Sequence, residues 1–180
     1  FQAKYPDRFF DIGIAEQDMI GTAAGLALGG KIPFATTYAV FVAGRAWDQV
    51  RTTVCYSNLN VKIAGAHGGI SAGGDGATHQ ALEDVAVMRV LPNMTVILPC
   101  DANEAKKATI AVSKMHGPAY LRFAGEATPV FTEENDPFEI GKANELRRGK
   151  DLTFIAAGPL VYEALLAHDQ LAAEGISARV

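Results

Sequence analysis

Short apolar segments with strand character alternate along this chain with longer segments of helical character. Because parallel strands need crossover connections of a dozen or more residues, usually helical, this alternation predicts an α/β fold with a mostly parallel sheet flanked by helices. The expected strands are residues 9–14, 33–37, 61–66, 94–98 and 119–123, and the expected helices are 16–28, 40–56, 79–90 and 102–114. Asp101 and Glu104 are spaced as a capping box at the start of the last helix.

Residues 124–150 interrupt this alternation. They are rich in acidic residues and prolines, with at most a short strand near 138–141, which is typical of a surface-crossing linker. A strand–helix–strand pattern then resumes over 152–156, 159–173 and 176–180. We therefore expect a first domain over residues 1–147, lacking its first strand, and the truncated start of a second domain over 148–180. The chain has no initiator methionine, which also suggests a fragment of a longer protein.

The bulk properties exclude several classes of protein. A formal net charge of −4 gives no broad basic surface, so we expect no nucleic-acid partner. The most hydrophobic stretch, residues 19–28, is shorter than the roughly 20 residues that a membrane-spanning helix needs, and the N-terminus does not resemble a signal peptide. Cys55 and Cys100 are too few for a disulfide scaffold, so a cytoplasmic location without a membrane partner is the expectation.

Glu16 stands where the first predicted strand gives way to a helix rich in glycine and alanine. Burial of a carboxyl among apolar neighbours raises its pKa, and such a group can hold or share a proton at neutral pH. The alternative is an ordinary acidic residue in the first turn of a helix, where the helix dipole favours it. In the same helix Gly21, Gly25 and Gly29 fall on one face, which indicates close approach of another backbone, either within this domain or across a subunit interface.

Two further segments carry side chains suited to binding. Tyr38 and Phe41 are three residues apart at the start of a predicted helix, so they either join the hydrophobic core or stack on a flat heterocycle. Residues 66–80 form a glycine-rich loop after a buried strand, the position where ligands bind in open α/β sheets, and carry His67, Asp75 and His79. Their spacing matches no standard metal-ligand pattern, so we predict no metal site within this chain.

Taken together, these segments resemble the pyrimidine-binding domain of the transketolase family. The resemblance rests on GIAEQ, TTYAVF, RAWDQVR and AHGGISAGGDGATHQALEDVAVMRVLPNM, in this order, and covers nearly the whole chain. The tail DLTFIAAGPLVYEALLAHDQL resembles the opening of the family's C-terminal domain. The resemblance implies a transferase that moves a two-carbon ketol unit between sugars, as in the pentose phosphate pathway, with thiamine diphosphate as cofactor.

The resemblance also implies a role for each matching residue. Glu16 would be catalytic, through a hydrogen bond to N1′ of the aminopyrimidine that favours its imino tautomer. Tyr38 and Phe41 would line the pocket of that ring. His67, Asp75, His79 and Arg122 would contact the sugar or sugar-phosphate substrate, with His79 also catalytic.

Other features bear on assembly and specificity. The family's GDG…N motif, which binds Mg²⁺ and the diphosphate, has no match here, because the GDG at 74–76 lies in the histidine-rich loop. The resemblance therefore implies a homodimer or heterotetramer that includes a diphosphate-binding domain or subunit, as in relatives split into two polypeptides. Relatives often carry a second arginine after the Leu121-Arg122 pair to clamp a substrate phosphate, whereas this chain has Ala124 and Gly125.

Three alternatives stay open from the sequence. A 1-deoxyxylulose-5-phosphate synthase shares the GIAEQ and DGxTHQ patterns but decarboxylates pyruvate. The β subunit of a 2-oxo acid dehydrogenase is disfavoured by DGATHQ and RVLPNM. A non-catalytic dimerising scaffold is disfavoured by the intact set of Glu16, Tyr38 and Phe41.

Overall fold

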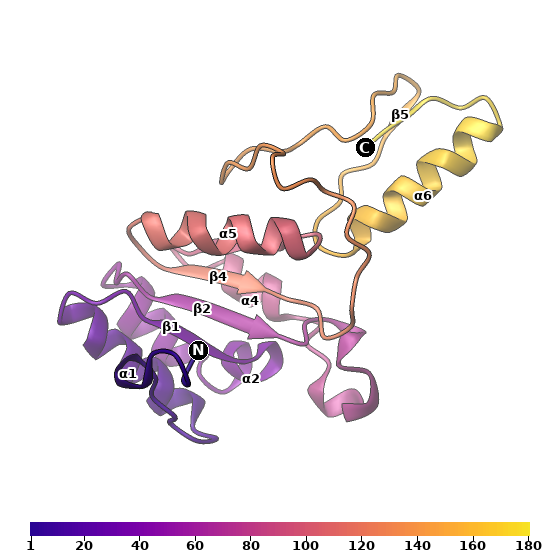
Figure 1. Ribbon diagram of the computed structural model, residues 1–180. Helices are drawn as coiled ribbons and strands as arrows, with labels where there is room; N and C mark the ends of the chain where they lie inside the picture. Colours follow the sequence, from indigo (N-terminus) through magenta and orange to yellow (C-terminus); the bar gives the residue numbers. More distant parts are fainter.

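Four parallel strands form the central sheet of the computed structural model, which describes residues 1–180 (Figure 1). Their order across the sheet is β1-β2-β4-β3. The chain therefore forms β3 at the edge of the sheet, and β4 then lies between β2 and β3. This all-parallel arrangement confirms the predicted α/β class. The strands are β1 (Phe34–Tyr38), β2 (Lys62–Ala66), β3 (Thr95–Ile97) and β4 (Ala119–Arg122).

Helices cover both faces of this sheet. On one face α1 (Glu16–Leu28), α2 (Ala39–Gly44), the π-helical turn η2 (Val50–Cys55) and α4 (Asp84–Arg89) surround the larger core, into which Ile63 and Tyr120 point. On the other face α5 (Ala102–Lys114) packs Ala108 and Val112 against Ala119 and Leu121 of β4. Successive residues of β4 therefore serve opposite cores, as the pleat of a strand requires.

The C-terminal part of the chain forms a separate small unit. It consists of β5 (Leu152–Thr153), α6 (Leu160–Ala173) and β6 (Ala178–Arg179), with β5 and β6 parallel. In Figure 1 α6 projects away from the four-stranded sheet, beyond the irregular segment that follows β4. No helix in the molecule combines the length and the apolar character that crossing a membrane would require.

Several predicted elements differ from the structure. Residues 9–14 are not a strand, because Gly13 adopts a left-handed φ of 72° and donates its N–H to Asp11 Oδ1, a local turn that competes with strand pairing. No strand forms at 138–141, where Phe138 and Ile140 instead pack against the α5 core. The strands predicted at 152–156 and 176–180 shorten to β5 and β6.

The two helices around the glycine-rich loop are also shorter than predicted. The segment 40–56 breaks after Gly44 into α2, the short α3 (Trp47–Gln49) and η2, which fits the cost of about 1 kcal/mol for glycine inside a helix. The helix expected over 79–90 is confined to α4, because Ala81 exchanges backbone hydrogen bonds with Gly69 and is thereby held out of the helix. By contrast, α1 has the predicted bounds, and the Asp101 carboxylate caps α5 by accepting from the Glu104 N–H.

Lys62 is a fully buried cation in β2 without a carboxylate partner. Its ammonium donates to the Met115 and Gly117 carbonyl oxygens at 3.0 and 2.6 Å, and burial lowers its pKa to about 8 from 10.5. Between these values the folded chain releases a proton that the unfolded chain keeps, so this group makes stability rise with pH across that window.

The expected result is a pH-dependent difference between the wild type and Lys62→Met. The free energy of unfolding of wild type minus variant should increase between about pH 8 and pH 9, by up to about 1 kcal/mol. Urea unfolding at the two pH values measures it. Taking the difference cancels the titration of Cys55 and Cys100, which keep the same burial in both chains. If the difference in the free energy of unfolding stays constant or falls between these pH values, burial does not lower the pKa of Lys62.

Candidate functional site

The carboxyl ends of the parallel strands carry several of the polar residues that stand out in the sequence. Tyr38 is the last residue of β1, His67 follows β2 directly, and Arg122 is the last residue of β4. In parallel sheets these ends lie along one edge, where ligands bind in open α/β folds. They define one candidate site.

A cluster of rings occupies this edge. The Tyr38 and His67 rings stack with centroids 4.5 Å apart, and the His79 ring meets Phe41 edge-on at 5.1 Å. The Tyr38 hydroxyl donates a 2.9 Å hydrogen bond to Asp75 Oδ2. Tyr38 and Phe41 are half-buried and stand outside the large core, so the core alternative for this pair is wrong. These predicted site residues, drawn from β1, α2 and the glycine-rich loop, thus lie together.

Glu16 begins α1 next to the end of β1. Its side chain is 4% exposed, and Oε1 lies 3.4 Å from the Thr37 hydroxyl. Its other oxygen, Oε2, is buried and has no hydrogen-bond donor, although Arg45 Nη1 lies 3.3 Å away as an ion pair. A buried carboxylate is costly unless it is paired, so an unsatisfied oxygen here indicates a place for a donor.

Arg45 connects Glu16 to the ring cluster. Its guanidinium carbon lies 4.2 Å from the centroid of the Phe41 ring, a cation–π distance, while Nη1 faces Glu16. A cavity of 340 Å³ opens here, lined by Arg45 and the residues at the start of α1. The Arg45 side chain is 48% exposed, so it has solvent to move into.

The glycine-rich loop is shaped by left-handed backbone and by one distant segment. His67 has a φ of 55°, and its Nδ1 is buried without a partner. Ser71 Oγ donates to the Gly68 carbonyl and accepts from the Gly125 N–H at 2.9 Å. A Cβ at Gly125 would lie 2.5 Å from His67 Cδ2, so only glycine fits at this crossing. Ser71 and Gly125 are 54 residues apart, and no sequence pattern indicated their contact.

Arg122 lies under this loop in a buried network. Its Nε is 3.4 Å from Asp84 Oδ2, and the Tyr120 hydroxyl donates to the same carboxylate at 2.7 Å. Burial raises the pKa of Tyr120, and the Asp84 charge raises it further, so the hydroxyl stays protonated. A Cβ on Gly68 would collide with the Arg122 side chain. Arg122 therefore packs against the glycine-rich loop, and its ion pair with Asp84 holds the guanidinium in place. Sequence reasoning missed Asp84.

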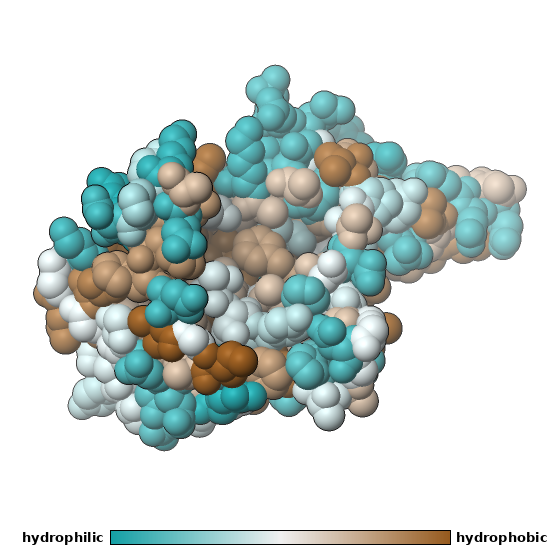
Figure 2. All heavy atoms as spheres, turned by 60° about the horizontal axis from the view of Figure 1, so that its bottom comes forward, coloured by the Kyte–Doolittle hydropathy of each residue, from teal (hydrophilic) through white to brown (hydrophobic).

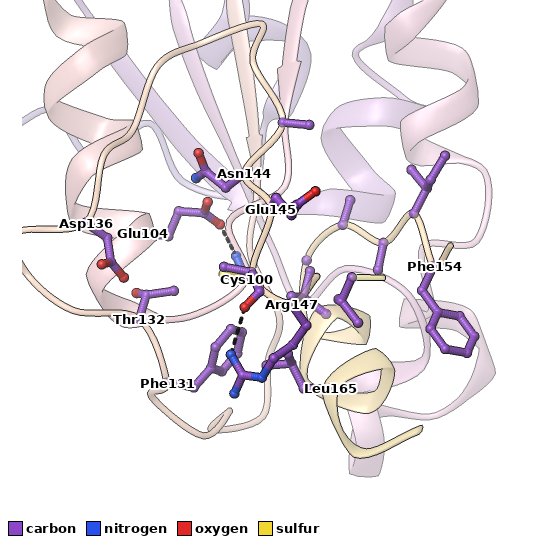
Figure 3. Close-up of a pocket in the computed structure, with 18 of the residues that line it drawn as sticks. Cys100, Glu104, Phe131, Thr132, Asp136, Asn144, Glu145, Arg147, Phe154 and Leu165 are labelled. Carbon is purple, nitrogen blue, oxygen red and sulfur yellow. Dashed lines mark hydrogen bonds between the residues drawn. The ribbon is translucent and has the colours of Figure 1, made fainter. Parts of the chain in front are cut away.

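A larger cavity than the one beside Arg45 lies elsewhere. It has a volume of 790 Å³ and is bounded by α5, the linker after β4 and the start of α6 (Figure 3). Its carboxylates serve the fold: Glu104 accepts from the Cys100 N–H at 2.6 Å, Asp136 accepts from the Glu133 N–H at 2.7 Å, and Glu145 pairs with Arg179. None of the residues predicted to bind cofactor or substrate lines it. We therefore assign the candidate site to the cluster around Glu16.

The exposed face of α1 adjoins the site. A Cβ placed on Gly21 or Gly25 would meet no atom within 4 Å, so the glycine stripe is not packed inside this domain and that alternative is wrong. Ile14, 90% exposed just before α1, and Leu28, 74% exposed at its last residue, add apolar surface near the two ends of the helix. Figure 2, with the α1 side brought forward, shows hydrophobic side chains standing out among hydrophilic ones. No group of three histidine, cysteine or acidic side chains is arranged to hold a metal ion.

Comparison with known families matches almost the whole chain. Residues 1–129 match the model described as "Transketolase, pyrimidine binding domain", and residues 141–180 match "Transketolase, C-terminal domain". The predicted domain boundary near residue 147 stays a prediction.

Individual relatives agree with these matches. The chain is 48% identical to the "Putative transketolase C-terminal section" of Methanocaldococcus jannaschii, and the match covers 100% of this chain and 58% of that protein. It is 44% identical to "6-deoxy-6-sulfo-D-fructose transketolase subunit SqwH" of Clostridium sp. (strain MSTE9), covering 100% and 56%. A solved structure described as "Split gene transketolase, inactive beta4 tetramer" is 47% identical with a TM-score of 0.91, covering 99% and 58%. The chain thus spans little more than half of these relatives.

Proposed function

We propose, because the chain belongs to the transketolase family, that it forms the pyrimidine-binding part of a thiamine-diphosphate-dependent transketolase. The reaction is transfer of a two-carbon ketol unit from a ketose to an aldose. The observation that carries the proposal is the buried Glu16 carboxylate with an unsatisfied Oε2, connected through the Arg45 guanidinium to the Phe41 ring.

The residues around Glu16 suit the aminopyrimidine of the cofactor. Oε2 would accept a hydrogen bond from a protonated ring nitrogen of the cofactor, and the Phe41 ring would offer a flat surface for the heterocycle. When bound, thiamine diphosphate supplies the electron sink for breaking and forming the carbon–carbon bond. The chain's own part is to hold a proton between that ring nitrogen and Glu16 Oε2, which belongs to a side chain that is only 4% exposed.

Arg45 has to give way for this to happen. Its guanidinium lies against both Glu16 Oε2 and the Phe41 ring, the two groups that we assign to the aminopyrimidine. We infer that Arg45 neutralises the buried carboxylate until the cofactor replaces it. Because the Arg45 side chain is 48% exposed, the displaced guanidinium would have solvent to move into and could meet an anionic substrate group there.

The glycine-rich loop supplies the proposed substrate contacts. The His67 and His79 imidazoles and the Asp75 carboxylate can bind sugar hydroxyls, and imidazoles pass protons near neutral pH. Arg122 remains a candidate contact for an anionic group of a sugar phosphate. Its ion pair with Asp84 leaves it less free than an unpaired arginine.

The proposed activity also needs a site for the diphosphate and Mg²⁺, and relatives described as a section or a subunit of a transketolase support a partner that supplies it. We propose a homodimer or heterotetramer that includes such a domain or subunit. The face formed by Gly21, Gly25, Ile14 and Leu28 is the proposed contact between pyrimidine-binding chains, next to Glu16.

Gly25→Gln is expected to weaken this association without unfolding the chain. The new side chain extends into open space, and glutamine is a better helix former than glycine by roughly 0.5 kcal/mol. Sedimentation should show an association constant lowered at least about tenfold, since close helix approach is blocked. Ala172→Gln on the exposed side of α6 is the matched control. Equal association of wild type and Gly25→Gln would contradict the assigned interface.

The function is tested by assembling the full-length chain with a diphosphate-binding subunit, thiamine diphosphate and Mg²⁺. Turnover of a ketose donor with an aldose acceptor is the expected result. Turnover of pyruvate with an aldose, without ketose use, would instead favour a 1-deoxyxylulose-5-phosphate synthase. Absence of both activities and of any cofactor-induced thermal shift would favour a scaffold.

A further inference from the structure

Tyr38 makes two contacts with the glycine-rich loop. Its ring stacks on the His67 imidazole with an angle of 22° between the planes, and its hydroxyl donates to Asp75 Oδ2. The His79 ring also meets it edge-on at 5.5 Å. One side chain at the end of β1 therefore touches every residue of the loop that we assign to substrate binding.

The loop needs such an anchor. Gly73 and Gly76, on either side of Asp75, have φ values of 57° and 79°, a conformation that glycine adopts freely. Asp75 is exposed, and its only side-chain hydrogen bond is the one from Tyr38. The Ser71 contact with Gly125 fixes the first part of the loop, whereas Tyr38 fixes the part that carries Asp75.

We propose that Tyr38 is a positioning residue for substrate hydroxyl recognition: it holds the Asp75 carboxylate and the His67 ring in place, and it is not the main stacking surface for the cofactor. This rests on the proposed function. With Oδ2 bound to Tyr38, Asp75 Oδ1 is left to accept a hydrogen bond from a hydroxyl of the acceptor sugar. Phe41, which already carries the Arg45 guanidinium on its face, is left as the ring for the aminopyrimidine.

The chemistry of the pair supports this role. The hydrogen bond to Asp75 raises the pKa of Tyr38, and the negative charge of Asp75 adds to the effect. The hydroxyl therefore remains a donor at neutral and mildly alkaline pH. Phenylalanine at this position would keep the stacking on His67 and lose only the tie to Asp75.

Tyr38→Phe in the full-length chain, assembled with its diphosphate-binding subunit, tests the proposal. The KM for the aldose acceptor should rise about tenfold, as expected for loss of a hydrogen bond to a charged group, while the Kd for thiamine diphosphate stays within about twofold. Tyr56→Phe, which removes the same hydroxyl at an 87% exposed position, is the control and should change neither.

A second readout isolates the hydroxyl contact. The wild type should discriminate between an aldose and its deoxy analogue lacking the hydroxyl that binds Asp75, and Tyr38→Phe should lose most of that discrimination. In a double-mutant cycle with Asp75→Ala, the effects on KM should not add. A raised cofactor Kd with unchanged KM, unchanged values of both, or additive effects would each overturn the proposal. Failure of the wild-type assembly to bind cofactor would instead refute the proposed function.

Discussion

Glu16→Gln is expected to remove nearly all turnover of the assembled protein while leaving the chain folded. Glutamine keeps the size of the side chain and an acceptor for the Thr37 hydroxyl, but it cannot exchange a proton with a ring nitrogen. General acid–base groups contribute about 10²- to 10⁴-fold to rates, so kcat should fall by that order. Steady-state kinetics with a ketose donor measures the loss.

Folding should survive the substitution for a physical reason. Replacing a 4% exposed carboxylate with a neutral amide lowers the cost of burial, and Arg45, being half-exposed, can be hydrated once its partner is gone. Thermal unfolding should therefore change little, and cofactor Kd should rise much less than kcat falls.

Asp18→Asn is the matched control for Glu16→Gln. It removes the same charge from the same first turn of α1, at an exposed position. Any general effect of charge on the helix dipole appears in both variants, whereas loss of turnover should appear only at Glu16. A Glu16→Gln assembly with more than half of wild-type turnover would refute the role of this carboxylate.

Local patterns in the sequence predicted the parts of this molecule that local physics decides. The end of α1 follows from the Gly29-Gly30 stop, and the start of α5 follows from the Asp101 cap. The gathering of Tyr38, His67 and Asp75 could also be anticipated, because the carboxyl ends of parallel strands meet at one edge of a sheet.

The remaining features depend on contacts between distant segments. The pairing of Ala81 with Gly69 shortens α4, and nothing in the helical pattern of residues 79–90 indicates it. The glycine stripe of α1 is compatible with packing inside the domain or across a subunit interface, and only the structure shows that Gly21 and Gly25 face open space. Arg122 matches a substrate contact by its motif, yet its ion pair is with Asp84, which no sequence motif marked.

The network of Asp84, Tyr120 and Arg122 gives the largest expected effect on stability. Asp84 is 1% exposed at the start of α4 and accepts from the fully buried Tyr120 hydroxyl, while the Arg122 guanidinium beside it is 16% exposed. Asp84→Ala would leave a buried cation without its counter-ion. Breaking a buried pair in this way costs about 3–5 kcal/mol, so the free energy of unfolding in urea should fall by that amount.

Three further variants separate the effect of the buried charge from that of the side-chain volume. Tyr120→Phe removes one hydrogen bond to a charged group and should cost about 1.5–3 kcal/mol, less than Asp84→Ala. Asp48→Ala, at an exposed position in α3, should stay within about 0.5 kcal/mol of the wild type. Asp84→Leu combined with Arg122→Met and Tyr120→Phe should recover much of the loss, since both charges and the hydroxyl that needs an acceptor are then absent.

The same network links stability to the site. Gly65 leaves room for the Tyr120 ring and Gly68 lies against Arg122, so the network forms the floor of the glycine-rich loop. Losing Asp84 frees Arg122 to shift under Gly68, and turnover should fall even where the variant remains folded. A free energy of unfolding for Asp84→Ala within about 1 kcal/mol of the wild-type value would contradict this account, because burying an unpaired guanidinium costs more than that.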